Sequence, residues 1–165
     1  MPKISIRPAT EADADLVLWF IQEFALYGNK PNDVTATSEQ LRQALAGPVP
    51  RIHALLVHIK TDDGEEKPAA FSLYFYNLSG WTGQPSLYME DMFVCSEYRR
   101  MGIGKLLLKQ VAGIAVEKGC AGMGWRARNS NTPAIDFYKN VGAKEINGFT
   151  GFSLDKKTMQ DFAST

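Results

Sequence analysis

The sequence predicts a mixed α/β fold in a single domain. Apolar runs of strand length alternate along the chain with apolar stripes of helical period, in the order β-α-α-β-β-β-α-β-α-β. A length of 165 residues suits one domain, which buries about two thirds of the unfolded surface in one core. Because no repeat, low-complexity tract or linker interrupts this order, we assign residues 1–165 to one domain.

The expected elements in chain order are strand 3–7, helix 11–27, helix 37–47, strands 52–59, 69–76 and 87–94, helix 102–118, strand 121–127, helix 132–142, strand 150–154 and a short helix from 155. Capping-box patterns at Thr10 with Asp13 and at Thr37 with Gln40 open the first two helices. Leu16, Phe20 and Phe24 supply the core stripe of the first helix. The polar residues 61–67 indicate a hairpin.

The later elements have their own terminal signals. Gly119 ends the helix that follows the third long strand, and Gly142 ends the next one. Thr132 as N-cap with Pro133 at the first helical position predicts where that next helix begins. Each boundary therefore rests on local backbone chemistry.

Composition excludes several classes of function. Eighteen basic and eighteen acidic residues cancel, so no overall field favours nucleic acid or an anionic membrane surface. Cys95 and Cys120 form neither a disulfide framework nor a zinc site, so we expect reduced thiols and no metal. The N-terminus has no signal-peptide pattern, and no apolar run approaches the roughly 20 residues of a spanning helix. We therefore expect a soluble cytoplasmic protein.

The most informative segment joins a strand to a helix through Tyr98-Arg99-Arg100-Met101-Gly102-Ile103-Gly104-Lys105. At a helix N-terminus, unpaired backbone N–H groups and the positive end of the helix dipole attract an anion, and glycine lets the backbone approach it closely. Arg99, Arg100 and Lys105 add positive charge. Neither the P-loop pattern nor the dinucleotide pattern G-x-G-x-x-G is present. On spacing alone, a tight turn without a ligand is the alternative.

The segment R-x-x-G-x-G, from Arg99 to Gly104, resembles the pyrophosphate-binding motif of the GNAT N-acetyltransferases. The residues around it resemble the diamine (spermidine/spermine) and thialysine acetyltransferase branch: Ile6–Asp13, Leu87–Val94 followed by Glu97–Arg99, Asn131, Ile135–Lys139 and Gly142–Ala143. Matching segments run in family order from about Ile4 to Asp155. The resemblance implies a mostly antiparallel central sheet with helices on both faces, acetyl-coenzyme A as co-substrate, and a homodimer.

The resemblance also implies the donor site. The residues expected to contact acetyl-coenzyme A are Met92, Phe93, Val94, Arg99, Arg100, Met101, Gly102, Ile103, Gly104, Lys105, Asn131, Ala134 and Tyr138. In the family, backbone groups of the strand at 92–94 pair with the pantetheine arm and stabilise the thioester oxygen.

Two adjacent carboxylates, Glu90 and Asp91, lie in an apolar strand, where burial without partners is costly. A primary amine with a pKa near 10.4 arrives protonated, so the reaction needs a proton acceptor. Strand alternation predicts that the two acids face opposite sides, unless the strand bulges here. Two solvated strand acids are the alternative; the resemblance selects Glu90 as the acid that contacts the amine.

Tyr138 shares an inward helical stripe with Ala134, Phe137 and Val141. By spacing alone, it is either a core tyrosine or a proton donor to the leaving thiolate. The match of Asn131 and Tyr138, seven residues apart, to the family's asparagine and general-acid tyrosine favours the second. His53 and His58 lie away from these motifs, and no cysteine–histidine pair supports a covalent intermediate. We therefore expect direct transfer in a ternary complex.

The acceptor site is less clearly marked in the sequence than the donor site. The residues expected to contact the acceptor, from the resemblance and with Asp91 added as the second strand acid, are Tyr27, Trp81, Glu90, Asp91, Trp125, Arg126 and Phe149. The polyamine pattern is broken, because Gly28 and Ser79 stand where acids are expected and Phe149 where tryptophan is expected. Fewer acids weaken the case for spermidine or spermine.

Arg126 and Arg128 alternate onto one strand face and would suit an acceptor that carries a carboxylate, such as thialysine, lysine or ornithine. Two surface arginines at a strand end are the alternative. Other functions that the sequence leaves open are a catalytically silent acyl-coenzyme A-binding module and a protein N-terminal or lysine acetyltransferase.

Overall fold

The computed structural model describes residues 3–164. It forms two compact units, one ending at Arg126 and one beginning at Ala127. The first unit contains the whole sheet, whose strands are β1 (Lys3–Pro8), β2 (His53–Lys60), β3 (Glu66–Leu78), β4 (Pro85–Val94) and β5 (Met123–Gly124). Their order is β1-β2-β3-β4-β5, with antiparallel pairing up to β4 and parallel pairing of β4 with β5. The mixed, mostly antiparallel sheet predicted above is confirmed.

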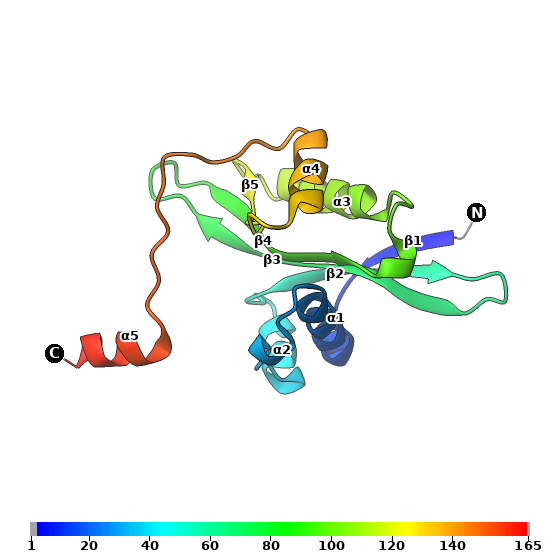
Figure 1. Ribbon diagram of the computed structural model, residues 1–165, viewed down its shortest axis with the longest axis horizontal. Coiled ribbons are helices and arrows are strands. Elements are labelled where there is room, and N and C mark those ends of the chain that lie inside the picture. The colour runs from blue at the N-terminus through cyan, green and yellow to red at the C-terminus, as the bar shows by residue number, and fades with distance from the viewer. Residues whose placement is uncertain (1–2, 165) are drawn as a thin grey trace. The chain divides into compact units, whose positions relative to one another are not determined.

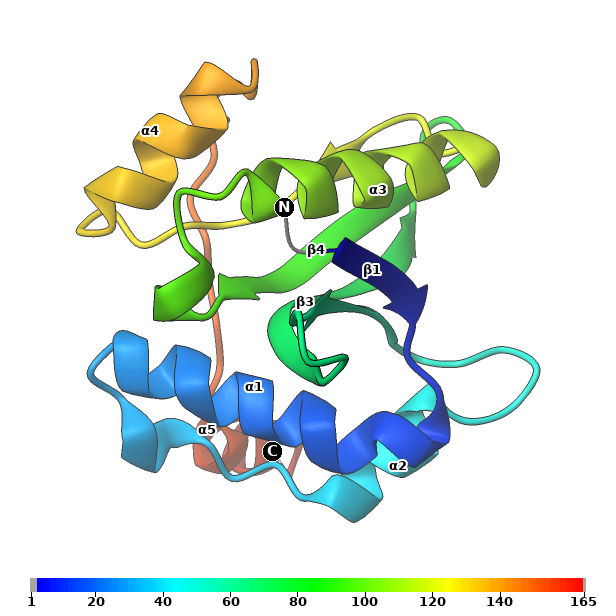
Figure 2. The same ribbon diagram turned by 90° about the vertical axis from the view of Figure 1, so that its right-hand side faces the viewer.

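Helices cover both faces of this sheet (Figures 1 and 2). The helical elements of the first unit are the short 3-10 turns η1 (Glu11–Asp13), η2 (Pro31–Asp33) and η3 (Ser96–Tyr98) and the helices α1 (Ala14–Tyr27), α2 (Ser38–Leu45) and α3 (Ile103–Glu117). The helices α1 and α2 lie on one side of the sheet and α3 on the other. None of the helices within residues 3–164 has the length and apolar character that crossing a membrane requires.

Both predicted capping boxes are confirmed. The backbone N–H of Thr10 donates to the Asp13 carboxylate at 2.8 Å, and the N–H of Gln40 donates to the Thr37 hydroxyl at 3.2 Å. Arg7 adds a bidentate pair to Asp13, which joins the end of β1 to the start of the helical segment. Since side-chain caps satisfy helix N–H groups that have no partner, these boundaries follow from the sequence.

The strand register sorts the core side chains into the two faces. Phe71 of β3 pairs with Leu56 of β2 and with Phe93 of β4, and all three are buried on the α1/α2 side. Phe20 of α1 stacks on Phe71 with ring centroids 5.0 Å apart. On the opposite side, α3 buries an apolar stripe that includes Leu107 and Val111. Both faces of the sheet therefore pack against helices, and β4 carries residues 90–94 of the candidate site.

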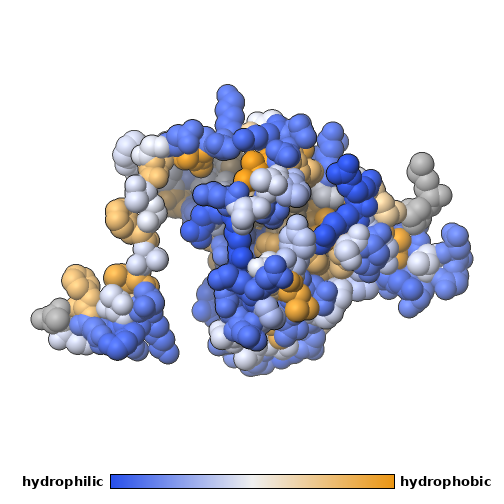
Figure 3. Space-filling view, in the orientation of Figure 1, coloured by the Kyte–Doolittle hydropathy of each residue, from blue (hydrophilic) through white to orange (hydrophobic). Residues whose placement is uncertain are grey.

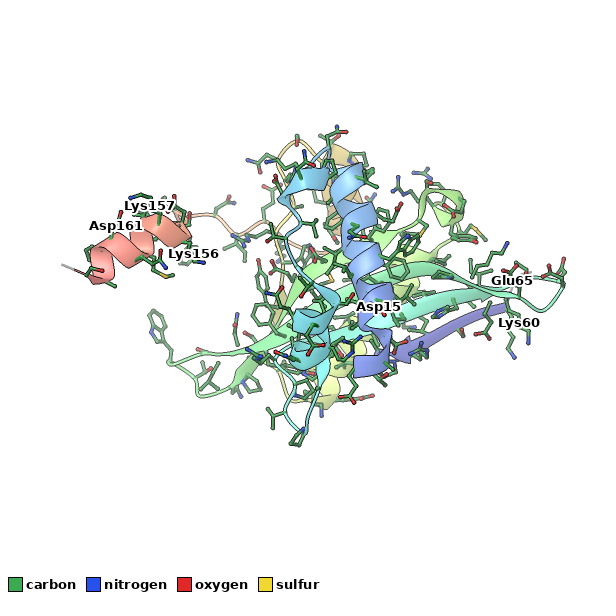
Figure 4. All side chains as sticks on the ribbon, turned by 90° about the horizontal axis from the view of Figure 1, so that it is seen from below. Asp15, Lys60, Glu65, Lys156, Lys157 and Asp161 are labelled. Atoms are coloured by element: carbon green, nitrogen blue, oxygen red, sulfur yellow. The ribbon has the colours of Figure 1, made fainter. Side chains whose placement is uncertain are left out.

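The hairpin between β2 and β3 extends further than predicted. Glu66 already begins β3, so the connecting turn is short, with Lys60 and Glu65 at its two ends (Figure 4). The strand predicted at 121–127 is much shorter, because β5 contains only Met123–Gly124. The last residue of β4 that pairs with β5 is Tyr88, two residues before Glu90, where β4 leaves the regular register.

The second unit contains α4 (Thr132–Asn140) and α5 (Lys156–Ala163). The predicted N-cap was wrong by one residue: Asn131 caps α4 by accepting from the N–H of Ala134, and Thr132 is the first helical residue. The strand predicted at 150–154 was also wrong, since these residues have no regular secondary structure. Gly148, with φ of 88°, and Gly151 flank and interrupt the run, and glycine weakens a strand.

Candidate active site

A β-bulge in β4 lies at the predicted pair of acids. Leu73 of β3 pairs with Asp91, but the next residue, Tyr74, pairs with Met89, so Glu90 is an extra residue in β4. The bulge breaks the strict alternation of side chains, so alternation does not predict the sheet faces on which Glu90 and Asp91 lie. Asp91 is half-buried on the α1/α2 side, opposite Leu73, while Glu90 is exposed. The direction of these side chains therefore depends on one extra residue in β4, which a pattern with a period of two does not reveal.

Asp91 has an unusual environment for a carboxyl group. Burial, and then the charge of the adjacent Glu90, raise its pKa from 3.8 to about 6. Neither acid has a hydrogen bond or ion pair within residues 3–164. A half-buried carboxyl beside an exposed one places two acids in different surroundings within one strand, which suits the handling of a protonated amine.

Beyond the bulge, β4 has an open backbone edge. Its ladder with β5 ends at Tyr88 and Gly124. The N–H of Cys95 donates to the carbonyl of Ala69, so that pair is hydrogen-bonded, and antiparallel geometry turns the backbone groups of Val94 and Met92 away from β3. These groups therefore face the side of β4 on which β5 has ended. An extended chain such as the pantetheine arm could pair with them as an added strand.

The turn before α3 has the properties of an anion cradle. Arg100 and Gly102 both have left-handed backbone conformations, with φ of 66° and 80°, and Gly102 is the N-cap. The first helical hydrogen bond runs from the N–H of Leu106 to the carbonyl of Gly102, which leaves the N–H groups of residues 103–105 without helical acceptors. The first turn contains no acid, and a Cβ at Gly102 would enter open space. These features fit the pyrophosphate of acetyl-coenzyme A.

Replacing Gly102 with alanine is expected to destabilise the protein by about 1 kcal/mol, because φ of 80° is strained for a residue with a Cβ. Gly113 is the matched control: it lies within α3 without a positive φ, also with open space around it, so alanine there should stabilise by about 0.5–1 kcal/mol. Thermal unfolding followed by circular dichroism should show shifts of opposite sign. Shifts of the same sign would contradict the assigned role of Gly102.

Arg99, the first residue of the motif, makes three contacts within the first unit. Its Nε donates to the carbonyl of Val94 at 2.9 Å. Its guanidinium carbon lies 4.4 Å from the ring centroid of Tyr27 and 5.5 Å from that of Phe93. Tyr27 and Phe93 are themselves neighbours, with centroids 6.2 Å apart. The end of α1, the end of β4 and the turn therefore meet at this arginine.

In the second unit, α4 and its N-cap together carry three of the expected donor-site residues. The side chain of Asn131 accepts from the N–H of Ala134 at 3.4 Å, so this asparagine has a structural role at the helix start. Burial raises the pKa of Tyr138 to about 12. The phenol of Tyr138 is therefore protonated throughout the physiological pH range, as a hydrogen-bond or proton donor must be.

The structure does not bring all of the expected acceptor residues together. Trp81 is 98% exposed on the loop before β4, whereas Tyr27 contacts Phe93 near the other end of that strand. From Pro85 to Phe93, the strand spans about 26 Å, so Trp81 and Tyr27 do not line one small pocket within this chain. Phe149 is 85% exposed, in a C-terminal segment whose surface carries further apolar side chains (Figure 3).

Tyr88, which the sequence did not single out as a site residue, contacts one of the expected acceptor residues. Its hydroxyl accepts a hydrogen bond from Nε of Arg126 at 2.8 Å. Tyr88 pairs with Phe75 and Asp91 pairs with Leu73, so Tyr88 and Asp91 share one face of the sheet. No local signal identifies this pair, because it depends on the parallel alignment of β4 with β5.

Comparison with known proteins identifies the family of the chain. Residues 22–143 match the model of the acetyltransferase (GNAT) family. The chain is 33% identical over 169 residues to thialysine N-epsilon-acetyltransferase of Sus scrofa, and the alignment covers 99% of each chain. A stretch of 76 residues, 46% of this chain and 33% of the relative, is 41% identical to L-ornithine N5-acetyltransferase of Arabidopsis thaliana. An integron cassette protein from the mobile metagenome of V. cholerae has a similar structure, with a TM-score of 0.76 and 25% identity over 98% of both chains.

Proposed function

The chain belongs to the acetyltransferase (GNAT) family and is an acetyl-coenzyme A-dependent N-acetyltransferase of small-molecule amines; from this premise we propose that its acceptor is an amino acid with a side-chain amine, of the ornithine, lysine or thialysine type. The acceptor names come from the relatives, which are named for thialysine and L-ornithine. The charges of the first unit supply an independent argument.

The observation that carries the proposal is the pair of Arg126 with Tyr88. The hydrogen bond from Nε holds the guanidinium in place, and the two Nη groups have no partner within residues 3–164. A guanidinium with free Nη groups binds a carboxylate in bidentate fashion. Such a group favours an acceptor with an anionic end.

The opposite charge lies further along the same strand. Asp91 is three residues from Tyr88 on the same sheet face, about 10 Å along the strand, and the exposed Glu90 lies between them. An amino acid with a side-chain amine carries a carboxylate at one end and an ammonium group at the other. We propose that Arg126 binds the carboxylate, while Glu90 and Asp91 receive the ammonium end and Glu90 accepts its proton.

The donor residues follow from the cradle and the open edge. The N–H groups of residues 103–105 would bind the pyrophosphate, and the backbone groups of Met92 with the N–H of Val94 would align the thioester arm. Acetyl-coenzyme A supplies the acyl group as a thioester. Tyr138 would donate a hydrogen bond and then a proton to the leaving sulfur.

A matched pair of acceptors tests this proposal. Putrescine is ornithine without its carboxylate, so the wild-type enzyme should have the higher kcat/KM for ornithine. Replacing Arg126 with alanine should lower kcat/KM for ornithine roughly 10- to 100-fold, the range expected for a lost hydrogen bond to a charged group, and should spare putrescine. Tyr88→Phe, which removes only the anchoring hydroxyl, should cause a smaller loss of the same kind.

Arg128→Ala is the control variant at the second arginine of this segment. It should leave the ratio of kcat/KM for ornithine to kcat/KM for putrescine unchanged. If wild type prefers putrescine, or if Arg126→Ala lowers turnover of both amines equally, the carboxylate is not the recognised group.

A further inference from the structure

Arg99 is placed differently from the other basic residues of the turn. Arg100 and Lys105 are exposed, whereas Arg99 is half-buried and its donor Nε is occupied by the carbonyl of Val94. The guanidinium carbon lies over the ring of Tyr27, the last residue of α1, 4.4 Å from the ring centroid. Three residues therefore bring positive charge to the turn, and of these Arg99 is the one that contacts both β4 and α1.

The carbonyl that Arg99 binds is one that the register turns toward the open edge of β4. Val94 and Ala70 form a non-hydrogen-bonded pair, because the hydrogen-bonded pair is Cys95 with Ala69. Without Arg99, this carbonyl would be the last hydrogen-bond acceptor available on the open edge of β4. With Arg99 bound to it, the groups still available for an added strand are the N–H and carbonyl of Met92 and the N–H of Val94.

We propose that Arg99 is a positioning residue that joins the donor side of the site to the acceptor side, and that it is not a ligand of the pyrophosphate. Through Nε it fixes the end of the β4 edge that aligns the thioester, and through its cationic centre it holds the ring of Tyr27, one of the residues expected to contact the acceptor. The inference rests on the proposed acetyl transfer and adds to it the residue that sets the relative position of the two substrates.

Lysine cannot replace arginine in this role. One guanidinium satisfies two geometric demands at once, a directed N–H bond from Nε to Val94 and a cationic carbon over the ring of Tyr27. An ammonium group is a point charge and would satisfy one of them. A pyrophosphate ligand, in contrast, would tolerate lysine, because phosphate groups bind point charges well.

Two thioester donors separate the roles. Acetyl-coenzyme A contains the pyrophosphate, and S-acetylpantetheine lacks it but keeps the thioester and its arm. Arg99→Gln should lower kcat/KM by about tenfold with both donors, mainly through kcat, and Arg99→Lys should behave like Arg99→Gln. Arg100→Gln is the matched control: this neighbouring arginine is exposed at the cradle, so its loss should weaken acetyl-coenzyme A alone.

A double variant tests the link between Arg99 and Tyr27. Arg99→Gln combined with Tyr27→Leu should be no slower than the worse single variant, since both changes break the same connection. The proposal is overturned if Arg99→Gln lowers activity with acetyl-coenzyme A only, if Arg99→Lys restores activity, or if the two losses multiply. Circular dichroism and melting temperature identify any misfolded variant, in which case Arg99→Lys carries the comparison.

These experiments use whichever amine the wild-type enzyme acetylates fastest. A preference for putrescine over ornithine would refute the carboxylate proposal and leave the comparison of the two donors intact. The two proposals therefore fail separately.

Discussion

Replacing Tyr138 with phenylalanine is expected to lower kcat by about 100-fold and to change KM for either substrate little. The pKa of Tyr138 is about 12, whereas a thiol has a pKa of about 8.5. Complete proton transfer to the sulfur is therefore uphill by about 5 kcal/mol, and we expect the hydroxyl to act first as a hydrogen-bond donor as the thiolate develops. Removing one such donor from a developing anion typically costs about 10²–10³ in kcat.

Thiol release in steady state, at about pH 7 and about pH 9, measures this effect. The loss should be the same at both values, because a phenol with a pKa of about 12 is protonated at each. Tyr76→Phe is the control, since Tyr76 lies on β3 outside the site and should keep full activity. A Tyr138→Phe enzyme with normal kcat would leave Tyr138 as a core tyrosine.

Replacing Asp91 with asparagine is expected to remove a pH dependence from the stability of the protein. Burial raises the folded-state pKa of Asp91 above its ordinary value, so the folded state holds the proton more tightly than the unfolded chain does. The associated stability is present below about pH 4 and is lost as pH rises through about 6. Two pKa units correspond to about 3 kcal/mol.

Urea unfolding at several values between about pH 4 and pH 7 tests this expectation. Relative to Asp91→Asn, the wild-type free energy of unfolding should fall by about 2–3 kcal/mol across that range. Asp62→Asn, at the exposed turn between β2 and β3, should run parallel to wild type. If the wild-type and Asp91→Asn curves also run parallel, the carboxyl of Asp91 is solvated and its pKa is ordinary.

Much of the fold is predictable from the sequence because its signals are local. The capping boxes at Thr10 and Thr37 satisfy N–H groups within three residues of themselves, so spacing alone identifies them. The turn into α3 depends on a glycine at φ of 80° directly before a helical stripe, which is again a property of adjacent residues. The anion cradle could therefore be expected without knowledge of any distant residue.

The wrong predictions concern elements whose structure depends on residues far away in the sequence. The strand expected at 121–127 shortens to two residues because its partner bulges at Glu90, and the strand expected at 150–154 does not form. A residue pattern with a period of two does not show that one residue has been inserted opposite its partner strand. For the same reason, the sequence does not show on which face of the sheet the side chains of Glu90 and Asp91 lie.

The sequence by itself therefore determined the mixed α/β fold, the glycine turn that we expect to bind an anion, and the residue types that amine acetylation needs. Only the tertiary structure decided how those residues are aimed: the bulge separates an exposed Glu90 from a half-buried Asp91, Tyr88 binds Arg126, and Arg99 contacts Val94 and Tyr27. Helix caps and glycine turns depend on bonds within a few residues. The direction of a side chain in a sheet depends on the register of strands that are far apart in the chain.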